Sequence, residues 1–178
     1  MADVRGQLAL VTGGTGGIGK ATCLKLAEVG CDVAIHYHTA RDDAEELARA
    51  IRKLNVRAEV FQADLSNYDE VRPPKCSDLS KIADCVQVRR LHKEVSTELG
   101  HPSILYNNAG TTLGKHQLTR IEQVTIEDFE TTWRANCGSA FLLTQLCMPA
   151  METIKWGRII FCSSVAGFIG GVVGPHYS

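Results

Sequence analysis

The strongest constraint on the fold of this chain is a glycine-rich stretch between an apolar run and a helical pattern. Residues 7–19 read Gln-Leu-Ala-Leu-Val-Thr-Gly-Gly-Thr-Gly-Gly-Ile-Gly, and residues 18–29 contain no proline. A strand, a glycine turn and a helix in this order place backbone N–H groups and a helix N-terminus against a phosphate. The spacing of Gly13, Gly17 and Gly19 suits a tight turn, a nearby pyrophosphate and a close helix–strand contact. A glycine-rich loop without a ligand is the alternative interpretation.

The bulk properties indicate one globular domain without a polyanionic partner. The chain has 178 residues, 44% of them hydrophobic, and a net charge of −1, so charge gives no argument for nucleic acid or an anionic membrane. No apolar run approaches the roughly 18 residues of a membrane span. Seven residues precede the first expected strand, at 8–11, so we expect no signal peptide. Seven cysteines, an odd number without a CxxC pair, predict reduced thiols and a cytoplasmic location.

The rest of the chain alternates expected strands with expected helices. Apolar runs predict strands at residues 8–11, 32–37, 56–62, 103–107 and 157–163. Helical spacing predicts helices at 18–29, 41–54 and 125–150, the last with one stripe of Phe129, Trp133, Ala140, Leu143 and Cys147. This alternation implies βαβ units, right-handed crossovers and a parallel sheet, whose ligands bind at the carboxyl ends of the strands.

A histidine pair lies at the end of the second expected strand. His36 and His38 are two residues apart, so a strand would present them on one side, where they could bind a metal. No third ligand with suitable spacing is visible, and we therefore predict no metal site. His38 matters more as the first residue beyond the strand.

Several short motifs follow one another along the chain. They are Thr12–Gly19 in the glycine turn, Asp64-Leu65 after the third strand, Asn107-Asn108-Ala109-Gly110 after the fourth, Asn136 on the long helix, Ser163-Ser164 after the fifth strand, and Tyr177 thirteen residues after Ser164. Together and in this order they resemble the TGxxxGxG, Asp, NNAG, Asn, Ser and Tyr motifs of the classical short-chain dehydrogenase/reductase family. Within that family, the sequence most resembles 3-oxoacyl-[acyl-carrier-protein] reductase-like members.

The resemblance implies an α/β fold with a Rossmann-type doubly wound parallel sheet of strand order 3-2-1-4-5. Residues 1–178 would form a single NAD(P)-binding domain, incomplete at its C-terminus. The residues implied to contact the cofactor are Gly13, Thr15, Gly17, Ile18, Gly19, His38, Arg41, Asp64, Leu65, Asn108, Ala109 and Gly110. Asn107 would instead be a structural bridge between strands.

The catalytic residues implied by the resemblance are Asn136, Ser164 and Tyr177. Ser164 would hydrogen-bond a substrate carbonyl, and Tyr177 would donate a proton as hydride arrives from the nicotinamide. An ordinary tyrosine has a pKa of about 10 and needs a nearby cation for acid–base chemistry near neutrality. Asn136 interrupts an apolar stripe; it is either a satisfied structural amide or, by the resemblance, part of a proton relay.

The end of the second strand bears on the choice of cofactor. An acidic residue there accepts hydrogen bonds from the ribose of NAD and repels a 2′-phosphate. The family's acid corresponds to Tyr37, and no acid occurs before Asp42. Arg41, with either His38 or Thr39, could meet a 2′-phosphate, which favours NADPH. Against this, Arg41 could be a solvated helix-start cation, and the family's basic residue in the glycine turn is Gly16 here.

The loop at 111–124 is expected to border the substrate. It carries Lys115, His116 and Arg120, which could favour an acidic or phosphorylated partner. A solvated loop is the alternative interpretation.

Residues 71–87 depart from the family pattern. Pro73 and Pro74 would break the single helix that the family has between its third and fourth strands. Joining Glu70 directly to Val88 restores a helix start with Val, Leu and Val at helical spacing. We hypothesise that this stretch is a translated intron; a genuine surface loop is the rival, and the sequence of the mature transcript distinguishes them.

The resemblance also implies a Lys four residues after Tyr177, whereas the sequence ends at Ser178. Strands and helices that follow in the family would be missing, leaving the fifth strand with exposed apolar surface and an unpaired edge. We expect the chain as written to fold poorly and to show little reductase activity. The parent activity would be NADPH-dependent reduction of a ketone, such as a 3-oxoacyl thioester, to a secondary alcohol, in an enzyme that is often a homotetramer or homodimer. The rivals are a sugar, polyol or steroid dehydrogenase and a non-catalytic dinucleotide-binding module.

Overall fold

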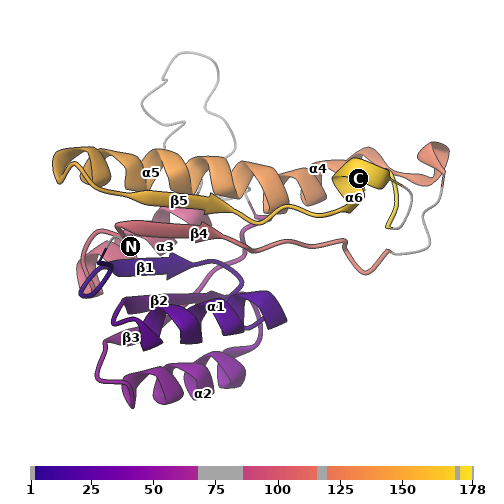
Figure 1. Ribbon diagram of the computed structural model, residues 1–178. Helices are drawn as coiled ribbons and strands as arrows, with labels where there is room; N and C mark the ends of the chain where they lie inside the picture. Colours follow the sequence, from indigo (N-terminus) through magenta and orange to yellow (C-terminus); the bar gives the residue numbers. More distant parts are fainter. Residues whose placement is uncertain (1–2, 68–85, 116–119, 171–172, 178) are drawn as a thin grey trace.

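The chain forms one five-stranded parallel sheet with helices on its two faces (Figure 1). The computed structural model describes residues 3–67, 86–115, 120–170 and 173–177. The strands are β1 (Leu8–Val11), β2 (Asp32–Tyr37), β3 (Ala58–Gln62), β4 (Ile104–Asn107) and β5 (Arg158–Phe161). Their order is β3-β2-β1-β4-β5, which confirms the predicted order of a doubly wound sheet. Neighbouring strands are all parallel, so their carboxyl ends lie along one edge of the sheet.

Two apolar clusters hold the helices on the sheet. The helices are α1 (Gly17–Glu28), α2 (Arg41–Arg52), α3 (Val86–Glu98), α4 (Ile126–Trp133), α5 (Ser139–Thr153) and α6 (Ala166–Ile169). One cluster joins Leu10 of β1 to Leu91 of α3 and Leu143 of α5. The other cluster contains residues of α1 and α2, among them Leu47, packed with β2 on the opposite face. The two clusters form the layers that β–α alternation in the sequence predicts.

The long helix expected at 125–150 is interrupted by a π-helical turn, Arg134–Gly138, between α4 and α5. Ala140, Leu143 and Cys147 are buried, but Phe129 and Trp133 are 50% and 53% exposed. The prediction of one shared apolar stripe is therefore wrong. A π turn holds an extra residue, which rotates the two parts of the helix relative to each other.

The atypical stretch at 71–87 lies mostly outside the described residues. Of the stretch 71–87, only Val86 and Gln87 are described, and they begin α3; the intron hypothesis stays a prediction. β5 lies at the edge of the sheet, where its Ile159 packs against the cluster that contains α5 and its Ile160 is 48% exposed. Within the described residues, no helix is both long and apolar enough to cross a membrane.

Candidate functional site

The carboxyl ends of β1 and β4 are joined by one buried hydroxyl. Thr12 Oγ1 accepts hydrogen bonds from the backbone N–H groups of Asn108 and Ala109, at 2.9 and 3.0 Å. The Asn108 amide nitrogen returns two bonds, to the carbonyl oxygens of Thr12 (2.9 Å) and Gly13 (3.1 Å). Two of the predicted cofactor-binding motifs, the glycine turn and the segment after β4, are therefore in direct contact.

Gly13, Gly17 and Gly19 of the turn differ in how strictly the fold requires a glycine. Gly13 has a φ of +63°, a left-handed conformation that side chains disfavour. A Cβ added to Gly19 would lie 2.2 Å from the carbonyl oxygen of Gly13, whereas a Cβ on Gly17 would meet nothing within 4 Å. Gly17 is thus dispensable for packing, and only a ligand would require it.

The start of α1 offers unused hydrogen-bond donors. In the described part of the chain, the amides of Gly17, Ile18 and Gly19 have no acceptor, because the first bond of the helix runs from Lys20 N–H to the carbonyl of Gly16. Ile18 is exposed and Thr15 is half-buried beside these amides. Free amides at a helix N-terminus are suited to an anion such as a phosphate.

His36 belongs to this site, although its sequence pattern did not reveal a role. Its ring is 2% exposed; Nδ1 accepts a hydrogen bond from Gly13 N–H, and Nε2 lies 3.0 Å from the carbonyl oxygen of Ala63. Burial lowers the pKa of His36 to about 4. Both ring nitrogens are thus engaged, and within the described ranges no three His, Cys, Asp or Glu side chains form a potential metal site.

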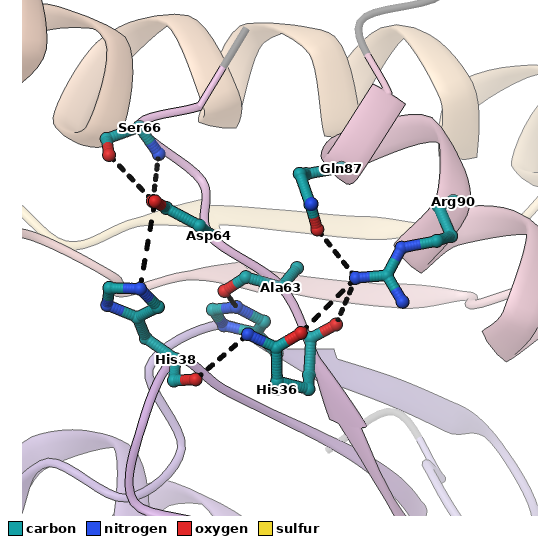
Figure 2. A network of polar contacts seen from close by, with 8 residues as sticks. His36, His38, Ala63, Asp64, Ser66, Gln87 and Arg90 are labelled. Carbon is teal, nitrogen blue, oxygen red and sulfur yellow. Dashed lines mark hydrogen bonds and ion pairs between the residues drawn. The ribbon is translucent and has the colours of Figure 1, made fainter. Parts of the chain in front are cut away.

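A pocket of about 180 Å³ lies at the carboxyl ends of β2, β3 and β4. Its lining includes His36, His38, Asp64, Leu65, Ala109 and Gly110. His38 Nε2 lies 3.7 Å from a carboxylate oxygen of Asp64 (Figure 2). Partial burial opposes ionisation of Asp64, but hydrogen bonds from the Ser66 hydroxyl and N–H outweigh it and lower the pKa of Asp64. The pocket lining therefore combines a carboxylate and two imidazoles with apolar residues.

The loop after β2 is tied to α3 through Gln62. The Gln62 side-chain amide donates to the carbonyl oxygen of His38 at 3.0 Å. Arg90 of α3 donates to the backbone oxygen of Gln62 at 2.9 Å and to the side chain of Gln87 at 2.6 Å (Figure 2). Arg41 begins α2 with an exposed side chain and does not line the pocket. Of the candidate residues for a 2′-phosphate, His38 thus lines the pocket and Arg41 does not.

Asn136 connects the π-helical turn to the segment after β4. Its side-chain oxygen accepts from Thr111 N–H at 2.7 Å, and its nitrogen donates to the Thr111 carbonyl at 3.0 Å. The next residue, Thr112, has its carbonyl 3.2 Å from Nε2 of the buried His176, which precedes Tyr177. These contacts bring Asn136 and the Tyr177 segment to one loop. Sequence reasoning missed His176 and Thr111, which have no motif of their own.

Ser164 is placed at the start of a short helix. Its hydroxyl oxygen accepts a hydrogen bond from the backbone N–H of Ala166 at 3.2 Å, just before α6. Among the described residues, no hydrogen bond joins Ser164 to Tyr177. The structure thus places both at the carboxyl side of the sheet without pairing them.

Two cations of the loop at 111–124 are already paired. Lys115 binds the carboxylate of Asp128, whose pKa this ion pair lowers, and Arg120 contacts Glu122 at 2.6 Å. His116 lies outside the described residues. Asn107 is buried, and its side-chain nitrogen and oxygen have no partner among the described residues, so the expected bridge between strands is not seen.

We predict that replacing Thr12 by valine destabilises the fold strongly. The amides of Asn108 and Ala109 would lose their acceptor, and each unsatisfied buried donor costs about 1–3 kcal/mol. Urea denaturation followed by circular dichroism measures the change. Serine at this position keeps the hydroxyl and is the matched control; equal losses for valine and serine would contradict the role of the hydroxyl.

Comparisons with known proteins identify relatives of the whole chain. The family model described as short chain dehydrogenase matches residues 7–73 and 78–178. A hydroxynaphthalene reductase-like protein Arp2 of Metarhizium robertsii is 32% identical over 96% of this chain and 55% of its own length. A 3-oxoacyl-[acyl-carrier-protein] reductase of Synechocystis sp. is also 32% identical, over 100% of this chain and 64% of its own length. An L-rhamnose 1-dehydrogenase (NADP(+)) of Thermoplasma acidophilum is 28% identical over 100% of this chain and 62% of its own length.

A solved structure agrees with these relatives. A blue fluorescent protein from a metagenomic library, in complex with NADPH, superposes with a TM-score of 0.78 at 28% identity. The superposition covers 99% of this chain and 63% of that chain. The chain spans 55% to 64% of the length of the three curated relatives. With its motifs, its strand order and a family match over most of its length, the chain belongs to the short-chain dehydrogenase family.

Proposed function

We propose that this chain binds NADP(H) along the carboxyl edge of its sheet, as part of an oxidoreductase that reduces a ketone to a secondary alcohol. The observation that carries the proposal is the group of free amides at the start of α1, beside the pocket at the ends of β2, β3 and β4. The NADPH complex of the structural relative and the NADP(+) in the name of the rhamnose dehydrogenase support the choice of dinucleotide.

Each part of the dinucleotide has candidate residues. The amides of Gly17, Ile18 and Gly19 would bind the pyrophosphate, because an anion is stabilised at a helix N-terminus. Asp64 and Leu65 would contact the adenine. The remaining candidates would contact the cofactor from two sides: Gly13 and Thr15 in the glycine turn, and Asn108, Ala109 and Gly110 after β4.

The phosphorylated ribose would lie beyond the end of β2. Tyr37 occupies the position of the family's acid, and its side chain is buried in the core. Arg41, on the first turn of α2, and His38 are both exposed there. A guanidinium forms strong charge-assisted bonds with phosphate, and the absence of a carboxylate at position 37 removes the repulsion. This local charge favours NADPH over NADH.

The chemical step needs a hydride, which bound NADPH supplies, and a proton. The Ser164 hydroxyl would hydrogen-bond the ketone oxygen, and the Tyr177 hydroxyl would deliver the proton to that oxygen. Asn136 would fix the Thr111 segment that borders both the pocket and the His176–Tyr177 turn. We propose a 3-oxoacyl thioester as the substrate, supported by the Synechocystis relative; a sugar is the alternative that the Thermoplasma relative supports.

A titration of the chain with NADPH and NADH, followed by cofactor fluorescence, tests the proposed binding. We expect NADPH to bind more tightly than NADH; equal affinity, or no binding of either, would contradict the proposal. Binding without turnover of an acetoacetyl thioester would favour a non-catalytic module.

Replacement of Arg41 by alanine is predicted to weaken NADPH binding about tenfold and to leave NADH binding unchanged. A charge-assisted hydrogen bond contributes about 1.5–3 kcal/mol, and partial exposure reduces its value. The same titration measures both affinities. Arg49→Ala is the control, since Arg49 is also exposed and lies in the last turn of α2. A parallel loss for both cofactors would rule out a phosphate contact.

A further inference from the structure

We infer that His36 is a positioning residue for the cofactor's pyrophosphate. Its buried ring joins the first amide of the glycine turn, that of Gly13, to Ala63, which precedes Asp64 in the pocket proposed to hold the adenine. The inference rests on the proposed function and adds a residue that the family motifs do not include. His36 would act through the backbone of the turn and would not itself touch the reacting atoms.

The hydrogen bonds of His36 specify one form of the ring. Gly13 N–H can only donate, so Nδ1, at 3.0 Å, must be the acceptor. The Ala63 carbonyl can only accept, so Nε2, at 3.0 Å, must carry the hydrogen (Figure 2). Only the neutral ring with its proton on Nε2 satisfies both partners. Burial, which lowers the pKa of His36 to about 4, keeps the ring neutral at physiological pH.

The same residue also holds the next amide of the turn. Gly14 N–H donates to the backbone carbonyl of His36 at 2.8 Å. Two successive amides, those of Gly13 and Gly14, therefore point toward β2. The following amides at the start of α1 have no acceptor within the described ranges and remain for a ligand. His36 thus separates the amides that fix the turn from the amides that can bind a phosphate.

The Nε2 side of the His36 ring contacts the segment of Ala63 and Asp64, which forms the other part of the site. Ala63 is buried, directly precedes Asp64, and lines the pocket together with His36. A displacement of the ring would shift the glycine turn relative to the Asp64 segment. Since the pyrophosphate and the adenine of one ligand must fit both at once, His36 sets the distance between their two binding surfaces.

Three substitutions separate the two hydrogen bonds. In His36→Asn the amide oxygen occupies the place of Nδ1 and can still accept from Gly13, but nothing reaches Ala63. In His36→Gln the amide nitrogen occupies the place of Nε2 and can still donate to Ala63, but Gly13 loses its acceptor. His36→Leu removes both bonds. A global effect on folding would not distinguish asparagine from glutamine in this way.

The experiment measures dissociation constants for NADPH and for adenosine 2′-phosphate, which lacks the pyrophosphate, with the wild-type chain and the three variants. We expect His36→Asn to bind NADPH within about threefold of wild type, and His36→Gln and His36→Leu to bind it about tenfold more weakly. Adenosine 2′-phosphate should bind all four proteins alike. Wild-type affinity of His36→Gln for NADPH, or equal losses for both ligands, would overturn the inference.

A ligand-free measurement distinguishes failure of this inference from failure of the proposed function. The ¹⁵N chemical shifts of the His36 ring report which nitrogen carries the proton, and the Gly13 amide resonance reports its hydrogen bond. We expect the Nε2-protonated tautomer in the wild type and a Gly13 amide that moves in His36→Gln but not in His36→Asn. The opposite tautomer would overturn the inference even if NADPH binds. Absence of NADPH binding with the expected tautomer would instead refute the proposed function.

Discussion

Alanine at position 19 is expected to destabilise this protein by at least about 3 kcal/mol and to abolish NADPH binding. The new Cβ would lie 2.2 Å from the Gly13 carbonyl oxygen and 2.9 Å from the side-chain nitrogen of Asn108. The carbonyl belongs to a turn held by His36 and Asn108, so it cannot move aside without breaking those bonds. Overpacking typically costs about 1–3 kcal/mol, and a fixed backbone atom places this site at the upper end or above. Guanidinium denaturation measures the loss.

Alanine at position 17 is the matched comparison, and it should behave differently. Its Cβ would meet nothing within 4 Å, and Gly17 does not need a positive φ. Stability should be unchanged or higher by up to about 1 kcal/mol, since alanine favours a helix more than glycine does. NADPH binding should still be lost, because the methyl group would lie among the amides proposed to bind the pyrophosphate. Normal stability of Gly19→Ala, or normal NADPH binding by Gly17→Ala, would contradict this assignment.

The second large effect is a loss of stability in mild acid that depends on His36. The folded protein holds His36 neutral, with a pKa of about 4, whereas in the unfolded chain the pKa is near the ordinary 6.5. Between these values the unfolded state binds a proton that the folded state does not, so stability rises with pH in this window. On acidification from pH 7 to pH 4, about 3 kcal/mol of the free energy of unfolding should be lost. Urea denaturation at a series of pH values measures it.

His36→Asn isolates this contribution. Around the ring, His38 opposes protonation and Asp64 favours it, and both remain in the variant. Burial also lowers the pKa of His92, whose effect has the same sign and cancels in the comparison. The variant should be less stable than wild type at pH 7, because it lacks the bond to Ala63, but its stability should fall less toward pH 4. Parallel curves for the two proteins would show that His36 does not titrate as its burial requires.

Much of the fold could be predicted from local pattern. The apolar run at 32–37 matches β2 at both ends, and regular alternation of strands and helices predicted the parallel sheet, whereas the strand order followed from the family resemblance. The division of the long helix into two parts could not be predicted, because a π turn leaves no periodic signal; Phe129 and Trp133, which precede the turn, are exposed. A sequence pattern with a helical period carries no information about a single inserted residue.

The site was only partly predictable, for a related reason. The pairing of the glycine turn with the Asn108 segment follows from motifs that adjoin the ends of β1 and β4. The role of His36 does not, since its partners are 23 residues before it and 27 after it. Lys115 could be recognised as a loop cation, but its pairing with Asp128 depends on how α4 packs. Contacts between distant segments are set by tertiary structure, which a single sequence reveals only through motifs.

The bonds between Thr12 and the Asn108–Ala109 segment have a consequence for the rate at which a ligand binds. The buried hydroxyl turns two amides of the segment after β4 toward β1, so the folded protein itself fixes the ends of these strands relative to each other. A dinucleotide would therefore meet a preorganised surface and would not have to order the chain around it. For a binding site of this kind, little affinity is spent on rearrangement, and association is limited by encounter rather than by a change of conformation.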